Sequence, residues 1–545
     1  MIRGIIEKIE NTKISIFDWI IGFICIVFVR FLLESISSPS PSGMMPTDPY
    51  TLIHYGLFFL AVILGLIFIT GYFTKNFVGS SKFILFIFPI MWTAPLIDLS
   101  LNRGGQAMSY IYALPRELFF NFFKFPFFIP VNGITFGMNV QIAVLFIAIA
   151  SYVWIKTGSY KNIFFTILSS YIFMFVLGAI PSLLYIISHA NNIGITTSQI
   201  SLYLEDVILK SNIFHNTLHE GAFSVSRFRF FQLGFDKLMS QILFVISFFI
   251  TIGFFWKSDK QKLSSILKNS RPIRITYYLA PLIIAMGYAV FFDYGTFYSW
   301  VDILGVICLL ISWFGMWMYS VHINDIYDIE IDKISNTERP LPENIISKED
   351  MIGSSYIFFA IAIIGSWCVG FYSFFFILVG LAVAYIYSAP PLRLRRITLL
   401  SSFVISIVIL SATLSGFFFI SIDKKIHTFP TLLSLGILIF YTLQINFKDI
   451  KDIEGDSKQD VKTLPVLFKK NGLKITGICF AISYLLVPFF LNFYAFYVVS
   501  IPTSLIGYKL ITKKPYNEKT IFLLHFLFLI GLIVVFFISK LLTKI

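Results

Sequence analysis

The sequence predicts an all-α polytopic membrane protein, in which a bundle of nine transmembrane helices is preceded by an additional bundle of about six. Of the 545 residues, 57% are hydrophobic and only 13% are Asp, Glu, Lys or Arg, whereas roughly a quarter of the residues of a soluble domain are charged. The mean hydropathy is +0.83, and the apolar residues gather in runs of about 20, the length that crosses a bilayer as a helix. This composition excludes a soluble enzyme.

The apolar runs divide the chain into two halves. In the first half, they predict spanning helices near 14–33, 51–74, 82–101, 134–155, 162–187 and 236–256. In the second half, they predict helices near 276–295, 300–323, 353–370, 372–388, 398–420, 429–446, 475–491, 492–509 and 520–541. A polar, basic stretch separates the two sets. The expected domains are therefore an N-terminal multi-span domain of unknown function at 1–256, a linker at 257–274 and a second membrane domain at 275–545.

The net charge of +13 is explained by membrane topology. Lys and Arg accumulate on the cytoplasmic loops of membrane proteins, and no basic arm or nucleic-acid-binding motif accompanies the charge, so no nucleic-acid partner is expected. In the second half, the loops after even-numbered spans are rich in basic residues, whereas the loops on the other side hold only Lys424 and Lys425. The basic loops and the linker are therefore expected in the cytoplasm.

Two groups of three aspartates follow spanning helices in the second half. They are Asp325, Asp328 and Asp332 after the second span, and Asp449, Asp452 and Asp456 after the sixth. The i, i+3, i+7 spacing predicts that each group shares one face of a helix. Carboxylates so placed repel one another at a membrane boundary, and Mg²⁺ would remove this repulsion while leaving coordination positions for phosphate and water. The alternative, solvated loop carboxylates, does not explain why the pattern occurs twice.

These groups carry a resemblance of residues 270–545 to the UbiA superfamily of intramembrane prenyltransferases. The motif N-D-x-x-D-x-x-x-D begins at Asn324, and the motif D-x-x-D-x-x-x-D begins at Asp449. Three flanking segments are also similar to the family: Arg339-Pro-Leu-Pro, Tyr387-Ser-Ala-Pro-Pro-Leu-Arg393 and Lys462-Thr-Leu-Pro. The resemblance implies a nine-helix bundle with a cavity that opens sideways to membrane lipid.

The resemblance also implies a reaction. An isoprenyl chain would move from a polyprenyl or geranylgeranyl diphosphate to a lipophilic acceptor, such as a quinone precursor, a tetrapyrrole or a glycerolipid. The six aspartates would be catalytic and hold Mg²⁺, which would stabilise the charge of the leaving diphosphate. By position, Asn324, Arg339, Arg393 and Lys462 would bind the diphosphate, and Tyr387 would stabilise the allylic cation with its aromatic face.

Other interpretations stay open at this point. A non-enzymatic lipid-handling or transport protein could use the aspartates as an ion site, although such sites are typical of mid-membrane depth and these aspartates lie beyond the apolar runs. His215 and His219, followed by Glu220, have a spacing that can bind zinc, but the sequence shows no third ligand. The first half could dock a partner, receive or present a lipid, or form one obligate bundle with the second half.

Overall fold

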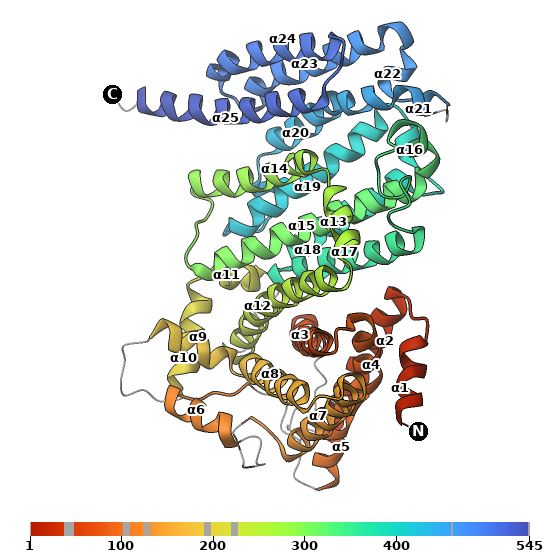
Figure 1. Ribbon diagram of the computed structural model, residues 1–545. Coiled ribbons are helices and arrows are strands. Elements are labelled where there is room, and N and C mark those ends of the chain that lie inside the picture. The colour runs from red at the N-terminus through yellow and green to blue at the C-terminus, as the bar shows by residue number, and fades with distance from the viewer. Residues whose placement is uncertain are drawn as a thin grey trace. The chain divides into compact units, whose positions relative to one another are not determined.

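The computed structural model (Figure 1) describes residues 2–37, 48–101, 110–124, 129, 131, 133–189, 198–219, 227–458 and 461–542. Within these residues the regular elements are α-helices and 3₁₀-helices, with one isolated β-bridge between Val131 and Ile134. The predicted all-α fold class is confirmed. In the described part, 15 helices or helix groups are long and apolar enough to cross a membrane. Helices suit this solvent because they satisfy their backbone hydrogen bonds internally, and the protein is a multi-pass membrane protein.

The chain folds into two compact units. The first comprises Met1–Leu263 and Tyr298–Cys308, and the second comprises Ser264–Phe297 and Leu309–Ile545. The division falls inside the stretch that the sequence predicts as a linker, within helix α13 (Lys260–Lys268). The first residues of α15 (Trp300–Tyr327), as far as Cys308, belong to the first unit.

The helices of the first unit surround α3 (Pro49–Thr74), which packs against α4, α7, α8 and α12. The remaining elements are α1 (Ile2–Asn11), α2 (Ile16–Ser37), α4 (Phe77–Ile87), η1 (Phe88–Trp92), α5 (Thr93–Ser100), α6 (Pro115–Lys124), α7 (Phe136–Thr157), α8 (Tyr160–Gly178), α9 (Ile180–Ser188), α10 (Ser198–Leu209), α11 (Asn212–His219) and α12 (Arg227–Ser258).

Prolines divide two of the predicted runs in this unit. The run near 82–101 becomes α4, η1 and α5, with Pro89 inside the 3₁₀ segment. The run near 162–187 becomes α8 and α9, with Pro181 in the first turn of α9. Proline lacks a backbone N–H and fits only the first turn of a helix without distortion, so the continuous hydropathy of these runs does not produce continuous helices.

The second unit is built around α19, whose spanning segment is 78% buried. It packs against α14, α18 and α20, while α20 packs against α23 and α23 against α24. The elements are α14 (Pro272–Phe291), the rest of α15, α16 (Ile329–Ser335), α17 (Lys348–Val369), α18 (Phe371–Ser388), η4 (Leu394–Arg396), α19 (Leu400–Ile420), η5 (Ile426–Thr428), α20 (Thr431–Gln444), η6 (Ile445–Asp452), α21 (Ile453–Lys458), α22 (Leu464–Leu467), η7 (Lys469–Asn471), α23 (Gly472–Phe490), η8 (Tyr494–Phe496), α24 (Tyr497–Thr512) and α25 (Glu518–Leu542).

Close packing of α14 on α19 depends on Gly416. A Cβ atom at this position would stand 2.1 Å from the carbonyl oxygen of Leu282. Small residues allow helix backbones to approach each other closely in membranes. The contact positions α14, which carries part of the wall of a cavity in this unit.

Candidate active site

A cavity of about 1050 Å³, a volume that includes its open part, lies within the second unit. Helices α14, α15, α18, α19 and α25 and the 3₁₀-helix η6 contribute to its wall. The charged residues of the lining are Arg271, Arg274, Asp332, Arg339, Arg395, Lys448, Asp449 and Asp452. Aromatic and aliphatic side chains make up most of the remaining wall, including Tyr277, Tyr278, Trp317 and Phe522.

The lining changes from apolar to polar along the helices. On α15, Met316, Val321 and Asn324 face the cavity, and Asn324 lies roughly 12 Å beyond Met316 at about 1.5 Å of rise per residue. On α18, the lining runs from Gly380 to Tyr387 near the helix end. The apolar wall therefore belongs to the helix interiors, and the charged residues lie at helix ends and in the short segments beside them.

The first aspartate of the first motif is held by three donors. Asp325 is 2% exposed and accepts hydrogen bonds from Asn269 Nδ2 at 2.7 Å, Arg271 Nη2 at 2.6 Å and Arg339 Nη1 at 3.2 Å. Hydrogen bonds between a guanidinium and a carboxylate are among the stronger ones in proteins. Asn269 and Arg271 come from the predicted linker, so this stretch contributes to the site and does not only connect the two halves.

Arg395 joins the two aspartate motifs. It forms an ion pair with Asp328, and its Nη2 donates to Asp456 Oδ1 at 3.0 Å. Asp328 also accepts from Arg393 Nη2 at 2.8 Å and from the side-chain amide of Asn324. Both aspartates are 1% exposed. A buried charge is tolerated when it is paired and hydrogen-bonded, which explains why arginines converge here.

Asn336 makes a second connection between the motifs. Its Nδ2 donates to Asp332 Oδ1 at 3.1 Å and to Asp452 Oδ1 at 3.3 Å. Asp332 also pairs with Arg339. Burial raises the pKa of Asp332 to about 6, although the positive charge of Arg339 acts in the opposite direction. Burial disfavours the cation of Arg339, but Asp325 and Asp332 outweigh this effect and raise its pKa.

The aspartates do not share one continuous helical face, so this prediction is wrong. Asp325 lies in the last turn of α15, Asp328 follows this helix as the N-cap of α16, and Asp332 lies in α16. In the second motif, the first two aspartates lie in the 3₁₀-helix η6 and the third lies in α21. A 3₁₀-helix has three residues per turn and aligns positions i and i+3, so the same spacing still places the first two carboxylates on one side.

Tyr387 faces a lysine. Lys448 Nζ donates to its hydroxyl at 2.9 Å, and the same ammonium group lies 5.1 Å from the centre of its ring. Both side chains line the cavity. The ring of Tyr387 is therefore placed so that a cation can lie against it. By contrast, Lys462 is exposed and is not part of the lining, and its carbonyl oxygen accepts a hydrogen bond from Thr398.

Four basic residues of the cavity were not among the predicted site residues. They are Arg271, Arg274, Arg395 and Lys448. Each lies near a helix end that is expected in the cytoplasm, where Lys and Arg are common for topological reasons. Their charge alone therefore could not distinguish residues of a site from residues that only set the topology. Only the proximity of Arg395 and Lys448 to sequence motifs could have suggested a role.

The described residues contain no group of three or more His, Cys, Asp or Glu side chains arranged to hold a metal ion. In the aspartate motifs, guanidinium groups lie against the carboxylates instead. One carboxylate oxygen, Oδ2 of Asp456, is buried and has no hydrogen-bond partner among the described residues. Of the zinc candidates, Glu220 lies outside the described residues, while His215 and His219 both lie in α11.

These features define a class: a polytopic helical membrane protein with a cavity that is acidic and basic at the helix ends and apolar beyond them. Residues 282–532 match the family model of the UbiA prenyltransferase family. This match confirms the predicted resemblance for the C-terminal half of the chain.

Several curated proteins are similar to this part of the chain. Digeranylgeranylglyceryl phosphate synthase from Sulfolobus acidocaldarius is 34% identical over 186 residues, which cover 33% of this chain and 64% of the synthase. Homogentisate phytyltransferase from Synechocystis sp. is 29% identical over 179 residues, which cover 29% of this chain and 56% of the transferase. Chloroplastic chlorophyll synthase from Avena sativa is 30% identical over 30% of this chain and 44% of the synthase. The chain thus spans less than two thirds of the length of these three relatives.

Among solved structures, a UbiA homologue from Archaeoglobus fulgidus bound to GPP and Mg²⁺ aligns with a TM-score of 0.41 and 18% identity, covering 50% of this chain and 99% of that one. A structure described as that of digeranylgeranylglyceryl phosphate synthase aligns with a TM-score of 0.34 and 23% identity, covering 50% of this chain and 96% of the other.

Proposed function

We propose that the protein is a Mg²⁺-dependent intramembrane prenyltransferase, which moves an isoprenyl chain from its diphosphate to a lipophilic acceptor. The observation that carries this proposal is the cavity of the second unit, where two aspartate motifs and converging arginines meet an apolar and aromatic wall. An isoprenyl diphosphate has the same division, because it joins a charged head to a hydrocarbon chain.

The aspartates fit Mg²⁺ by their chemistry. Mg²⁺ prefers a few carboxylate oxygens and leaves its remaining positions to water and substrate phosphates. The Oδ2 atom of Asp456, which has no partner among the described residues, is a carboxylate oxygen that a cation would satisfy. In this proposal Asp325, Asp328 and Asp332 hold one ion and the aspartates of the second motif hold another. Bound Mg²⁺ would supply positive charge to stabilise the leaving diphosphate.

The arginines of the cavity would also bind the diphosphate. Arg271, Arg339 and Arg395 neutralise aspartates, and all three also line the cavity. Guanidinium groups bind phosphate oxygens as readily as carboxylates. They are therefore placed to receive the diphosphate together with Asn324 and Arg393, the head-group residues that the sequence predicts. Lys462 is exposed and lies outside the cavity lining, so its position does not support a direct contact with the diphosphate.

The apolar wall would hold the isoprenyl chain. Tyr277, Tyr278 and Trp317 belong to this wall, and their rings exclude water from the allylic carbon. Breaking the allylic C–O bond leaves positive charge on that carbon, which an aromatic face stabilises. Tyr387 is the proposed residue because it lies in the segment that resembles the family and its side chain lines the cavity.

A transport function would use the same carboxylates as an ion path. Such sites are typical of broken helices at mid-membrane depth, whereas both aspartate motifs begin where the spanning helices α15 and α20 end. This placement favours the enzyme.

The test is to incubate the purified full-length protein with Mg²⁺, radiolabelled geranylgeranyl diphosphate and glycerolipid, quinone-precursor and tetrapyrrole acceptors in separate reactions. We expect label to enter one acceptor class and the reaction to stop when the metal is chelated. Ion flux through reconstituted vesicles, with no labelled product from any acceptor or from a lipid extract of the host, would favour transport instead.

A further inference from the structure

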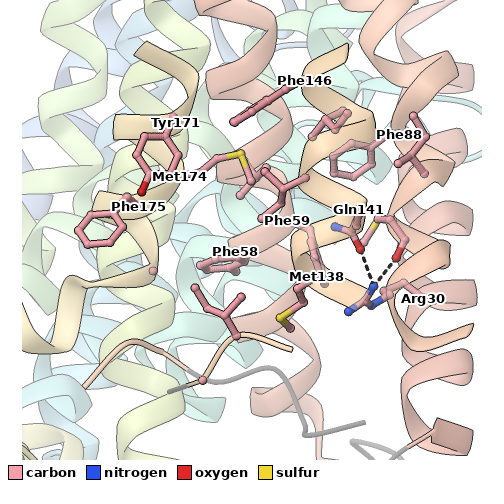
Figure 2. A pocket seen from close by; sticks show the side chains of 18 of the residues that line it. Arg30, Phe58, Phe59, Phe88, Met138, Gln141, Phe146, Tyr171, Met174 and Phe175 are labelled. Carbon is pink, nitrogen blue, oxygen red and sulfur yellow. Dashed lines mark hydrogen bonds between the residues drawn. The ribbon is translucent and has the colours of Figure 1, made fainter. Parts of the chain in front are cut away.

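The first unit contains a cavity of its own. With its open part, this cavity has a volume of about 1040 Å³. Helices α2, α3, α7 and α8 and the 3₁₀-helix η1 contribute to its wall. Figure 2 shows Phe58, Phe59, Met138 and Met174 around the space, with Arg30 and Gln141 together at one side.

Almost all of the wall is apolar. Aromatic rings and methionines predominate, and both suit a flexible hydrocarbon chain because methionine adapts its shape and aromatic rings offer large apolar faces. A cavity with only this lining could hold any hydrophobic molecule. The polar residues at one side are therefore what distinguishes the ligand.

Arg30 is a buried charge that faces the cavity. It is 3% exposed, lies in a helix that can span the membrane, and is part of the lining. Its Nε donates to Glu34 Oε2 at 3.1 Å, and its Nη1 donates to Gln141 Oε1 at 2.9 Å and to the carbonyl oxygen of Met91. Ionisable residues inside membrane spans are costly, and they mark functional sites.

Two groups of N–H donors remain at this side. Among the residues that the structure describes, Nη2 of Arg30 and Nε2 of Gln141 have no hydrogen-bond partner. A donor that loses its water to a ligand and gains no acceptor in exchange costs about 1–3 kcal/mol. A ligand with oxygen acceptors in its head group would satisfy both side chains at once.

The charges around Arg30 indicate what kind of oxygen it binds. Glu34 already balances the guanidinium charge at 3.1 Å. An anionic head group would add a second negative charge next to Glu34, and an uncompensated charge is expensive in a low dielectric. A carbonyl or ester oxygen accepts the same hydrogen bonds without this penalty.

We infer that this cavity binds an uncharged single-chain lipid. Its carbonyl or ester oxygen accepts hydrogen bonds from Arg30 and Gln141, and its hydrocarbon chain lies among the aromatic and methionine side chains. This function belongs to the first unit and is independent of the prenyl transfer proposed for the second.

Photolabelling of the full-length protein in membranes tests this inference. The probe is a monoacylglycerol with a diazirine in its acyl chain. Two comparison probes carry the same chain, one as a fatty-acid carboxylate and one as a hydrocarbon without oxygen. We expect the monoacylglycerol to label peptides that contain Met138 and Met174, about tenfold more strongly than either comparison probe.

Variants separate the cavity from the bulk membrane. Gly178→Leu should fill part of the space, because a Cβ at this position meets only Ile111 Cδ1, at an ordinary 3.7 Å. This variant should lose most of the labelling, whereas Val176→Leu, on the lipid-exposed side of the same helix, should keep it. Gln141→Leu should weaken labelling by the monoacylglycerol and leave labelling by the hydrocarbon unchanged, which a purely structural role of Gln141 does not predict.

Three results would overturn the inference. One is labelling that Gly178→Leu does not reduce. Another is stronger labelling by the carboxylate than by the monoacylglycerol, which would indicate an anionic ligand. The third is equal labelling by the monoacylglycerol and the hydrocarbon, with no effect of Gln141→Leu. Because Arg30 holds three groups together and its replacement could disturb folding, the decision rests on Gly178 and Gln141.

Discussion

At the scale of single residues, the aspartates of the second unit differ in their burial and in the side chains that they contact. Asp328 lies between two arginines and is 1% exposed. Asp452 is half-buried, and its hydrogen bond to Asn336 is 3.3 Å long. Removing one partner of a buried ion pair leaves an uncompensated charge. Replacing Asp452 should therefore affect the chemistry of the site alone, whereas replacing Asp328 should affect both the chemistry and the stability of the protein.

Asp452→Ala should abolish prenyl transfer without unfolding the protein. We expect the turnover number to fall by roughly 100-fold or more, as when one electrostatic contributor to a transition state is removed, with an unchanged thermal unfolding midpoint. Asp328→Ala should lose activity and also lower this midpoint, because Arg393 and Arg395 lose their carboxylate. Glu454→Ala is the matched control, since this carboxylate is 77% exposed. Near-normal turnover of Asp452→Ala at saturating Mg²⁺ would contradict the two-motif site.

Arg395 and Arg396 are adjacent basic residues with different expected roles. Arg395 lines the cavity and pairs with both motifs, whereas Arg396 is exposed. Arg395→Gln should raise the KM for the isoprenyl diphosphate about tenfold or more, the loss expected for a hydrogen bond to a charged group. Arg396→Gln should leave the KM unchanged. Similar kinetics for the two variants would show that Arg395 contributes only to topology.

At the scale of elements, the spanning helices lie where the apolar runs predict them, because hydropathy alone decides which segments enter a bilayer. Breaks at Pro89 and Pro181 interrupt two runs without lowering their hydropathy. The aspartate spacing did not predict the local structure of the two motifs, since i, i+3 pairs align in both α- and 3₁₀-helices. The pairing of Arg271 with Asp325 depends on contacts between distant segments, which no local pattern shows.

The packing of α14 on α19 supports the cavity wall, and a substitution can test it. Gly416→Ala would bring a Cβ within 2.1 Å of Leu282 O. Overpacking of this kind costs about 1–3 kcal/mol, so the thermal unfolding midpoint should fall. Gly287→Ala is the control on α14, because a Cβ there meets nothing within 4 Å. Equal midpoints for the two variants would show that the helices do not pack as closely as described.

At the scale of the whole molecule, two units with separate cavities share one chain. The family match covers 282–532. We propose that 275–545 carries the chemistry, with Arg271 of the 257–274 stretch completing its polar wall and Asn269 donating to Asp325. The domain 1–256 would then contribute lipid binding, as inferred from its own cavity.

The proposed orientation places both aspartate motifs on the cytoplasmic side. In a variant without the four native cysteines, a cysteine at the exposed Ser457 should resist a membrane-impermeant thiol reagent in intact cells and react after lysis. A cysteine at the exposed His427, in the loop expected on the opposite side, should react in intact cells. A cysteine at position 457 that reacts in intact cells, together with one at position 427 that does not, would show that the orientation is the opposite one.

The central claim is that the aspartate motifs bind the diphosphate through Mg²⁺. Equilibrium binding of radiolabelled geranylgeranyl diphosphate to the full-length protein tests it most directly, with Mg²⁺ or with chelator, for the wild type and for Asp452→Ala. The account predicts binding by the wild type that requires Mg²⁺, and binding by the variant that is at least about tenfold weaker. Equally tight binding with and without Mg²⁺, in both proteins, would contradict it.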